Sequence, residues 1–208
     1  LPEDEGGGRP GVARLLNEPS AARVPFSPPL LQAGELYVSQ TANILQYLGP
    51  RLGLVPDDEA SRLWAHQLQL TMADWLVEIH DTHHPIAKSL YYEQQKDAAR
   101  ARAADFLQLR LPKFLGYFER VLGAASTAEP GLVGPRWSYP DLSLFHMVEG
   151  LRYAFPRAML GLAPNHPRIL ALRDRVAAIP PVAAYLASPR HMAFNDKGIF
   201  RHYPELDP

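Results

Sequence analysis

Apolar residues recur every three or four positions along most of the chain after residue 57, and this spacing constrains the fold more than any other feature. A stripe at this spacing buries one face of an α-helix. The helices expected from the clearest stripes cover residues 64–79, 107–122, 142–148 and 169–179. We therefore expect an all-helical domain, which the sequence places at residues 54–208.

The first 53 residues predict a small mixed α/β domain. Two short apolar runs, residues 30–31 and 36–38, flank a tight turn and predict a pair of strands. Helical spacing starts at Gln40 and is closed by Gly49 and Pro50. Residues 53–58 are expected to link the two domains.

Proline accounts for 21 of the 208 residues, about twice the roughly 5% that is usual in globular proteins. Pro28 and Pro29 predict the start or the edge of the first strand, because proline cannot donate a ladder hydrogen bond. Pro112 predicts a kink within the second long helix. The pair that begins at Pro180 predicts the end of the last clear helix.

Composition excludes several classes of function. Lys and Arg number 21 against 22 Asp and Glu, for a net charge of -1, so no basic surplus predicts a nucleic-acid partner. No apolar run reaches the roughly 18 residues that span a bilayer, so no membrane insertion is expected. The chain contains no cysteine, which excludes thiol nucleophiles and Cys-ligated zinc, and fits a cytoplasmic location without proving it.

Two motifs carry the strongest signal. The first joins Pro28-Pro29-Leu30-Leu31 to a helix that opens on Gln40-Thr41, and the second is the capping box Ser138-Tyr139-Pro140-Asp141. Together they resemble the cytosolic glutathione transferase family, over about residues 24 to 186. The resemblance implies a thioredoxin-like α/β N-terminal domain, incomplete here, over residues 1–53, and an all-α helical-bundle C-terminal domain over residues 54–208.

The resemblance implies that Pro29, Leu30, Gln40 and Thr41 bind glutathione. A helix N-terminus offers unpaired N–H groups and partial positive charge to a carboxylate. In the family a cis-proline opens this strand, so the resemblance also implies a cis bond before Pro29, which would turn the backbone toward an extended peptide ligand. The plainer alternative is an ordinary strand edge followed by an ordinary helix start.

The catalytic residue stays unknown. Members of the family begin with a strand, a helix and a second strand, and a residue near the end of the first strand activates the glutathione thiol. Residues 1–24 lack such a pattern, apart from a possible short helix around Leu15. We therefore expect a unit of roughly 35 residues to precede Leu1 in the protein, because two strands alone leave open edges. No tyrosine of the chain is assigned this role.

Asp74 is the carboxylate expected to reach the ligand of a partner subunit, because similar helices of the family supply such an acid. A solvated or intrachain-paired Asp74 is the alternative. Ser138 and Asp141 are interpreted as a structural helix cap, since the capping-box spacing already explains them. A catalytic role for Asp141 is the rival interpretation.

The densest ionisable cluster is His80-Asp81-Thr82-His83-His84. Its histidines have a spacing that can bind zinc, but no further ligand is evident nearby, so we expect no metal and a polar stretch facing the interdomain cleft or solvent. In the family such residues would line the acceptor pocket, which makes His83 and His84 candidates. Tyr91 and Tyr92 are further candidates for its aromatic walls, with core packing as the alternative.

These features predict a homodimeric detoxification enzyme of the glutathione transferase type. It would join the thiolate of glutathione, a co-substrate, to a hydrophobic electrophile. The alternative is a non-catalytic interaction or scaffold protein with the same fold, because a fold never guarantees an activity. The aromatic tail, residues 194–204, is expected to pack as an irregular strip over the helical domain rather than to be disordered.

Overall fold

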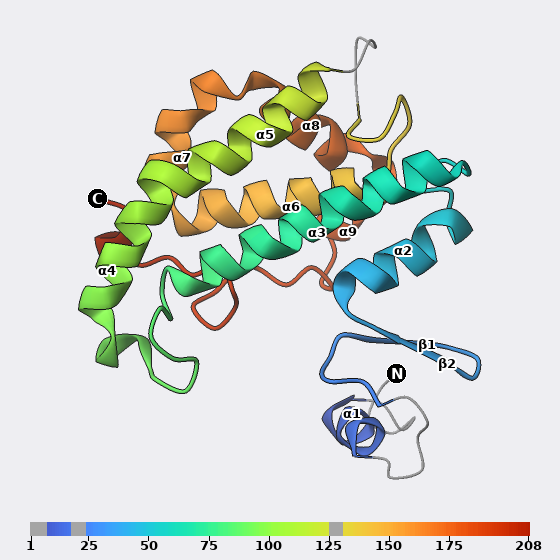
Figure 1. Cartoon of the computed structure of the whole chain (residues 1–208), viewed down its shortest axis with the longest axis horizontal. Helices are drawn as coiled ribbons and strands as arrows, with labels where there is room; N and C mark the ends of the chain where they lie inside the picture. Colours follow the sequence, from blue (N-terminus) through green and yellow to red (C-terminus); the bar gives the residue numbers. More distant parts are fainter. Residues whose placement is uncertain (1–7, 18–23, 125–130) are drawn as a thin grey trace.

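The computed structural model describes residues 8–17, 24–124 and 131–208 (Figure 1). The N-terminal part consists of α1 (Gly8–Leu16), β1 (Leu30–Ala33), β2 (Leu36–Ser39) and α2 (Thr41–Arg51). The strands form the predicted antiparallel hairpin, in which Leu30 pairs with Ser39 and Ala33 with Leu36. Gly34 supplies a positive φ of 62° in the turn, a conformation that glycine adopts without steric cost.

The rest of the described chain is helical, as the apolar spacing predicts. Its α-helices are α3 (Glu59–Asp81), α4 (Lys96–Asp105), α5 (Leu111–Gly123), α6 (Tyr139–Ala154), α7 (Pro156–Leu162), α8 (Pro167–Ala178) and α9 (Pro180–Leu186). Short 3-10 turns are η2 (Tyr92–Gln94), η4 (Ala163–Asn165) and η5 (Pro204–Leu206). Helix α6 packs against both α3 and α8, while α2 packs on α3 and joins the hairpin to the helical part (Figure 1).

The apolar stripes of α3, α5, α6 and α8 meet in one core. At its centre the Trp75 ring stacks on Phe114 at 5.1 Å and on Phe118 at 5.9 Å between ring centroids. All three side chains are buried. Aromatic contacts of this kind contribute about 0.5–1.5 kcal/mol each beyond the buried area.

Two proline effects differ in detail from the prediction. Before Pro112 the helix widens into a π-helical turn, η3 (Phe106–Arg110), so Pro112 lies in the first turn of α5, where its missing N–H costs little. Helix α8 ends at Ala178 as expected, but Pro180 then starts α9 rather than a loop. Proline at the first helical position is pre-organised for the next helix.

The C-terminal tail packs along the helical part, as predicted. Phe200 is buried against Gly150 of α6, and His202 Nδ1 lies 3.1 Å from the carbonyl oxygen of Ala154. Asp207 accepts hydrogen bonds from the first backbone N–H groups of α7, at 2.7 and 2.9 Å. The tail is therefore part of the core rather than an appendage.

Across the three described ranges, no helix combines the length and the hydropathy needed to cross a membrane.

Candidate functional site

The first candidate site lies where the hairpin meets α2. The peptide bond between Pro28 and Pro29 is cis, as predicted. Leu30 pairs with Ser39. Pro29 precedes Leu30 and Gln40 follows Ser39, so these two residues lie at the same end of the antiparallel hairpin. Their side chains are exposed. The hairpin register thus brings together two residues that are distant in the motif.

Gln40 adopts a left-handed backbone conformation, with a φ of 68°, directly before α2. This conformation costs a residue with a side chain about 1–2 kcal/mol, and such strain collects at ligand sites. Among the described residues, no side chain caps the N-terminus of α2, and its first turn carries no acidic residue. The first N–H groups of α2 are therefore available to a carboxylate, beside the exposed hydroxyl of Thr41.

The hairpin offers a second recognition element. Within the described ranges the sheet has the two strands β1 and β2, and the main chain at Pro29 and Leu30 lies at the end of the hairpin that also carries Gln40. Main-chain groups at the end of a strand can pair with an extended peptide through hydrogen bonds. Leu30, at the start of β1, lies next to the cis bond and at the same end as Gln40. The site can therefore hold a short peptide that carries a free carboxylate.

Asp74 lies on the outer surface of α3. Its side chain is exposed, and it forms no hydrogen bond or ion pair with the residues that the structure describes. Three exposed apolar residues of α3, Leu63, Leu70 and Val77, recur at seven-residue intervals on the same side of the helix. At 3.6 residues per turn, the four positions fall within an arc of about 60°.

Ser138 and Asp141 form the predicted capping box at the start of α6. The Asp141 carboxylate accepts hydrogen bonds of 2.8 Å from the backbone N–H groups of Ser138 and Leu132, and another from the Ser138 hydroxyl. Burial raises the pKa of Asp141, while these hydrogen bonds act in the opposite direction. The Asp141 carboxylate is fully buried and engaged in these hydrogen bonds, so its geometry favours the structural interpretation.

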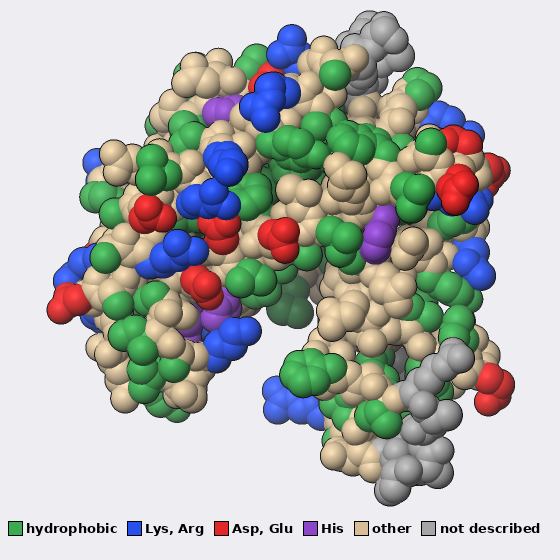
Figure 2. All heavy atoms as spheres, viewed as in Figure 1, with side chains coloured by type: hydrophobic (Ala, Val, Ile, Leu, Met, Phe, Trp, Pro, Cys, Tyr) green, Lys and Arg blue, Asp and Glu red, His purple; other side chains and the backbone are tan. Residues whose placement is uncertain are grey.

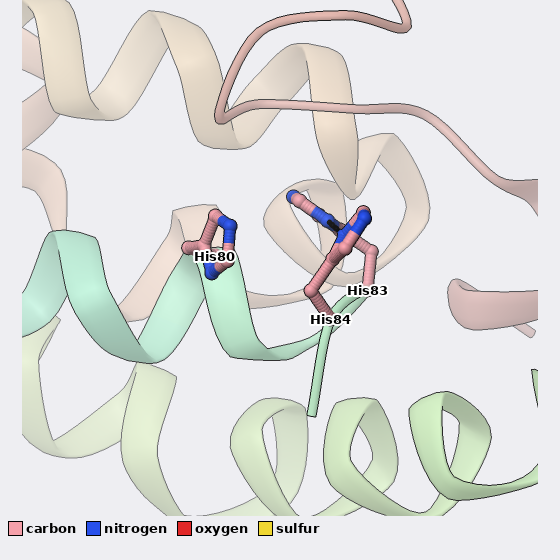
Figure 3. A group of neighbouring side chains, drawn as sticks. All are labelled: His80, His83 and His84. Atoms are coloured by element: carbon pink, nitrogen blue, oxygen red, sulfur yellow. Dashed lines mark hydrogen bonds between the residues drawn. The ribbon is translucent and has the colours of Figure 1, made fainter. Parts of the chain in front are cut away.

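His80, His83 and His84 meet at the end of α3 (Figure 3). Their ring centroids lie 4.8–5.3 Å apart. The expectation of a polar stretch facing a cleft or solvent is wrong for His83, whose side chain is buried beneath the tail. Its Nε2 atom lies 2.8 Å from the carbonyl oxygen of Ile199. Burial is also the main reason why the pKa of His83 falls to about 3.

The two tyrosines proposed for an acceptor pocket lie in different environments. Tyr91 is exposed, whereas Tyr92 is buried and stacks on Tyr203 at 3.8 Å between centroids. The Tyr92 hydroxyl donates a 3.0 Å hydrogen bond to Glu205, and burial with this bond raises the pKa of Tyr92. The structure therefore places Tyr92 in core packing, the alternative weighed for it, rather than in an open pocket wall.

A cavity of about 270 Å³ lies between α2, α3 and the start of α6. Its lining residues are Gln46, Pro50, Arg51, Val55, Arg62 and Tyr139. None of the four acceptor-pocket candidates belongs to this set. Figure 2 also shows a broader hollow between the N-terminal part and the lower end of the helical part.

Sequence reasoning missed the positive φ of Gln40 and the contact between His83 and the tail. A Gln before a helix gives no sign of a left-handed backbone, a conformation that usually marks glycine or asparagine. The His83 contact joins residues 116 positions apart, which local spacing cannot relate. The aromatic content of the tail was the available signal that it packs on something.

Comparison with known proteins agrees with this architecture. The family model for "Glutathione S-transferase, C-terminal domain" matches residues 80–189, more than half of the chain. A glutathione S-transferase of Plasmodium yoelii yoelii is 23% identical over 183 residues, which cover 88% of this chain and 78% of that protein. One from Plasmodium falciparum is 22% identical over 170 residues, covering 80% and 72%.

Solved structures show the same fold. A Pi-class glutathione S-transferase of Onchocerca volvulus aligns with a TM-score of 0.61 at 20% identity, over 76% of this chain and 69% of that one. Prostaglandin synthase D of Nilaparvata lugens aligns with a TM-score of 0.63 at 18% identity, over 80% and 76%. The small sheet and the helical domain therefore form an incomplete thioredoxin-like domain followed by a glutathione transferase helical domain, and the chain belongs to the glutathione transferase family.

Proposed function

We propose that this protein is an enzyme that binds glutathione at the junction of the hairpin and α2 and transfers its thiolate to a hydrophobic electrophile. The observation that carries the proposal is the left-handed Gln40 at the uncapped N-terminus of α2, next to the cis bond before Pro29. In the proposed reaction the sulfur comes from glutathione, the co-substrate. The assignment of residues 1–53 and 54–208 to two domains, the cytoplasmic location and the role in detoxification belong to the same proposal.

Glutathione fits the two recognition elements in different ways. Its γ-glutamyl carboxylate would meet the N–H groups of α2, the Gln40 amide and the Thr41 hydroxyl. Its peptide backbone would pair with the main chain at Pro29 and Leu30, at the start of β1. The electrophile would enter the hollow between the two parts of the molecule (Figure 2). The thiol first gives its proton to a base that we do not assign to a residue. The resulting thiolate then forms a carbon–sulfur bond, either as the bond from that carbon to a leaving group such as halide breaks, or by addition to an activated double bond whose other carbon takes up a proton.

Replacing either Gln40 or Thr41 with alanine is expected to weaken glutathione binding by about 10–150-fold. The physical reason is the loss of a hydrogen bond to a charged ligand, which contributes about 1.5–3 kcal/mol. Calorimetric titration with glutathione measures the change. Gln32→Ala, an exposed glutamine on β1, serves as the matched control and should retain the wild-type affinity.

Two results would contradict this part of the proposal in different ways. A wild-type protein that neither binds immobilised glutathione nor conjugates an activated aryl halide would contradict the enzymatic function. Normal binding that is unchanged in both Gln40→Ala and Thr41→Ala would leave the function standing but remove the site assignment.

The exposed face of α3 supports a homodimer as part of the proposal. Leu63, Leu70 and Val77 form a seven-residue repeat that is exposed in the single chain. Interfaces of helices commonly use this repeat, because it keeps one stripe facing the partner. Asp74 lies on the same face, where its carboxylate could meet the ammonium group of the glutathione bound by the partner subunit.

Leu70→Glu is expected to convert the dimer to a monomer, because it places a charge in an apolar contact that would lose its water. Light scattering after size-exclusion chromatography gives the mass directly. Leu160→Glu is the control, since Leu160 is also exposed but lies on α7, away from this face. A Leu70→Glu protein that stays dimeric would show that the dimer, if formed, uses another surface.

A further inference from the structure

Three imidazole rings converge at the C-terminal end of α3 (Figure 3). His80 belongs to the last turn of the helix, and His83 and His84 follow its C-cap, Thr82. The Thr82 hydroxyl donates a 2.7 Å hydrogen bond to the carbonyl oxygen of Ile79, which fixes the turn that presents the rings. One ring nitrogen from each histidine lies within 4.8 Å of the other two.

The hydrogen bonds of His83 fix which nitrogen carries its proton. The carbonyl oxygen of Ile199 can only accept, so the Nε2 atom of His83, 2.8 Å away, is the donor. The Nδ1 atom of His83 forms a 2.5 Å hydrogen bond with the Nδ1 atom of His84, so these two nitrogens share one proton and a metal ion that binds them must displace it.

His80 is arranged in the same way. Its Nδ1 atom lies 3.3 Å from a carboxylate oxygen of Asp81, which leaves the lone pair of Nε2 free. A histidine that donates one N–H to a carboxylate or a backbone carbonyl, and offers the other nitrogen, is the usual metal-binding arrangement. Both His80 and His83 have it, with Asp81 and Ile199 as their acceptors.

The charges around the cluster act in both directions. The carboxylates of Asp81 and Glu93 favour a cation near His80 and His84. The Arg201 guanidinium, which donates a 2.7 Å hydrogen bond to the carbonyl oxygen of Gly198, opposes it. Binding must therefore come from coordination by nitrogen, not from a general attraction of cations.

We propose that His80, His83 and His84 bind a divalent transition-metal ion, with Zn²⁺ as the ion to be tested. Imidazole ligands suit zinc, copper and nickel, whereas Mg²⁺ and Ca²⁺ prefer oxygen. Zinc–nitrogen bonds of about 2.0–2.1 Å require nitrogens about 3.3–3.4 Å apart in a tetrahedral site. His84, which is only half-buried, turns so that its nitrogen moves away from His83, and the fourth position stays open to water.

The experiment is a Zn²⁺ titration of the untagged protein against a chromogenic chelator. The expected result is saturation at one Zn²⁺ per chain, without competition from Mg²⁺. The double variant His80→Ala/His84→Ala, which leaves the buried His83 in place, should weaken binding by more than about 100-fold. Asp81→Asn should weaken it by about 10-fold or more, because it removes the carboxylate behind His80.

His191→Ala is the matched control, because His191 is a partly exposed histidine that contacts only Tyr185 among aromatic rings of the described chain. It should bind Zn²⁺ like the wild type. Circular dichroism of each variant verifies that it is folded. The proposal is overturned if the folded wild type takes up no stoichiometric Zn²⁺, if the double variant binds as tightly as the wild type, or if His191→Ala weakens binding equally. None of these results bears on glutathione binding.

Discussion

Replacing Asp141 with alanine is expected to lower the free energy of unfolding by about 3–5 kcal/mol. The carboxylate accepts from the backbone N–H groups of Leu132 and Ser138, both at 2.8 Å. Alanine would leave these two donors buried without a partner, and each such donor costs about 1–3 kcal/mol. The loss of the buried carboxylate itself, whose pKa is raised by burial, recovers part of this cost.

Ser138→Ala measures the contribution of the capping hydroxyl apart from the other hydrogen bonds of Asp141. It removes one hydroxyl but leaves Asp141 bonded to both backbone groups, so a loss of about 1 kcal/mol is expected. Urea unfolding followed by circular dichroism measures both variants. Equal losses for Asp141→Ala and Ser138→Ala would show that the two backbone bonds of the Asp141 carboxylate, from Leu132 and from Ser138, contribute nothing.

Local rules predicted the features of this fold that depend on neighbouring residues. The hairpin, the helix that begins at Thr41 and the capping box at Ser138 each follow from a few adjacent side chains, whereas the cis bond before Pro29 was expected from the family resemblance. The spacing of the apolar residues and the residues that start and end each element can be read from the local sequence. The same holds for the stripes that form the core around Trp75.

Contacts between distant residues could not be predicted in this way. The bond from His83 to Ile199 and the bond from Tyr92 to Glu205 both join the end of α3 and its following loop to the tail. Spacing within one segment carries no information about which other segment covers it. The sequence therefore suggested that His83 faces a cleft or solvent and left Tyr92 between a pocket wall and core packing, while both side chains are buried.

The second large effect is expected at Gly150, where α6 touches the tail. A Cβ atom at this position would lie 2.4 Å from the Phe200 ring, far closer than real contacts allow. Gly150→Ala should therefore displace Phe200 and cost about 2–3 kcal/mol, even after the gain of about 0.5–1 kcal/mol that alanine brings to a helix. Urea unfolding measures the loss, and hydrogen exchange locates it over residues 198–203.

Gly161→Ala in α7 is the matched control, because a Cβ atom there meets nothing within 4 Å. It should leave stability unchanged or raise it by up to about 1 kcal/mol. A loss at Gly150 no greater than at Gly161 would contradict the close packing of Phe200. Phe200 is next to Ile199, whose carbonyl oxygen accepts the hydrogen bond from His83. The absence of a side chain at Gly150, which lets Phe200 pack on α6, therefore also helps to position the histidine cluster.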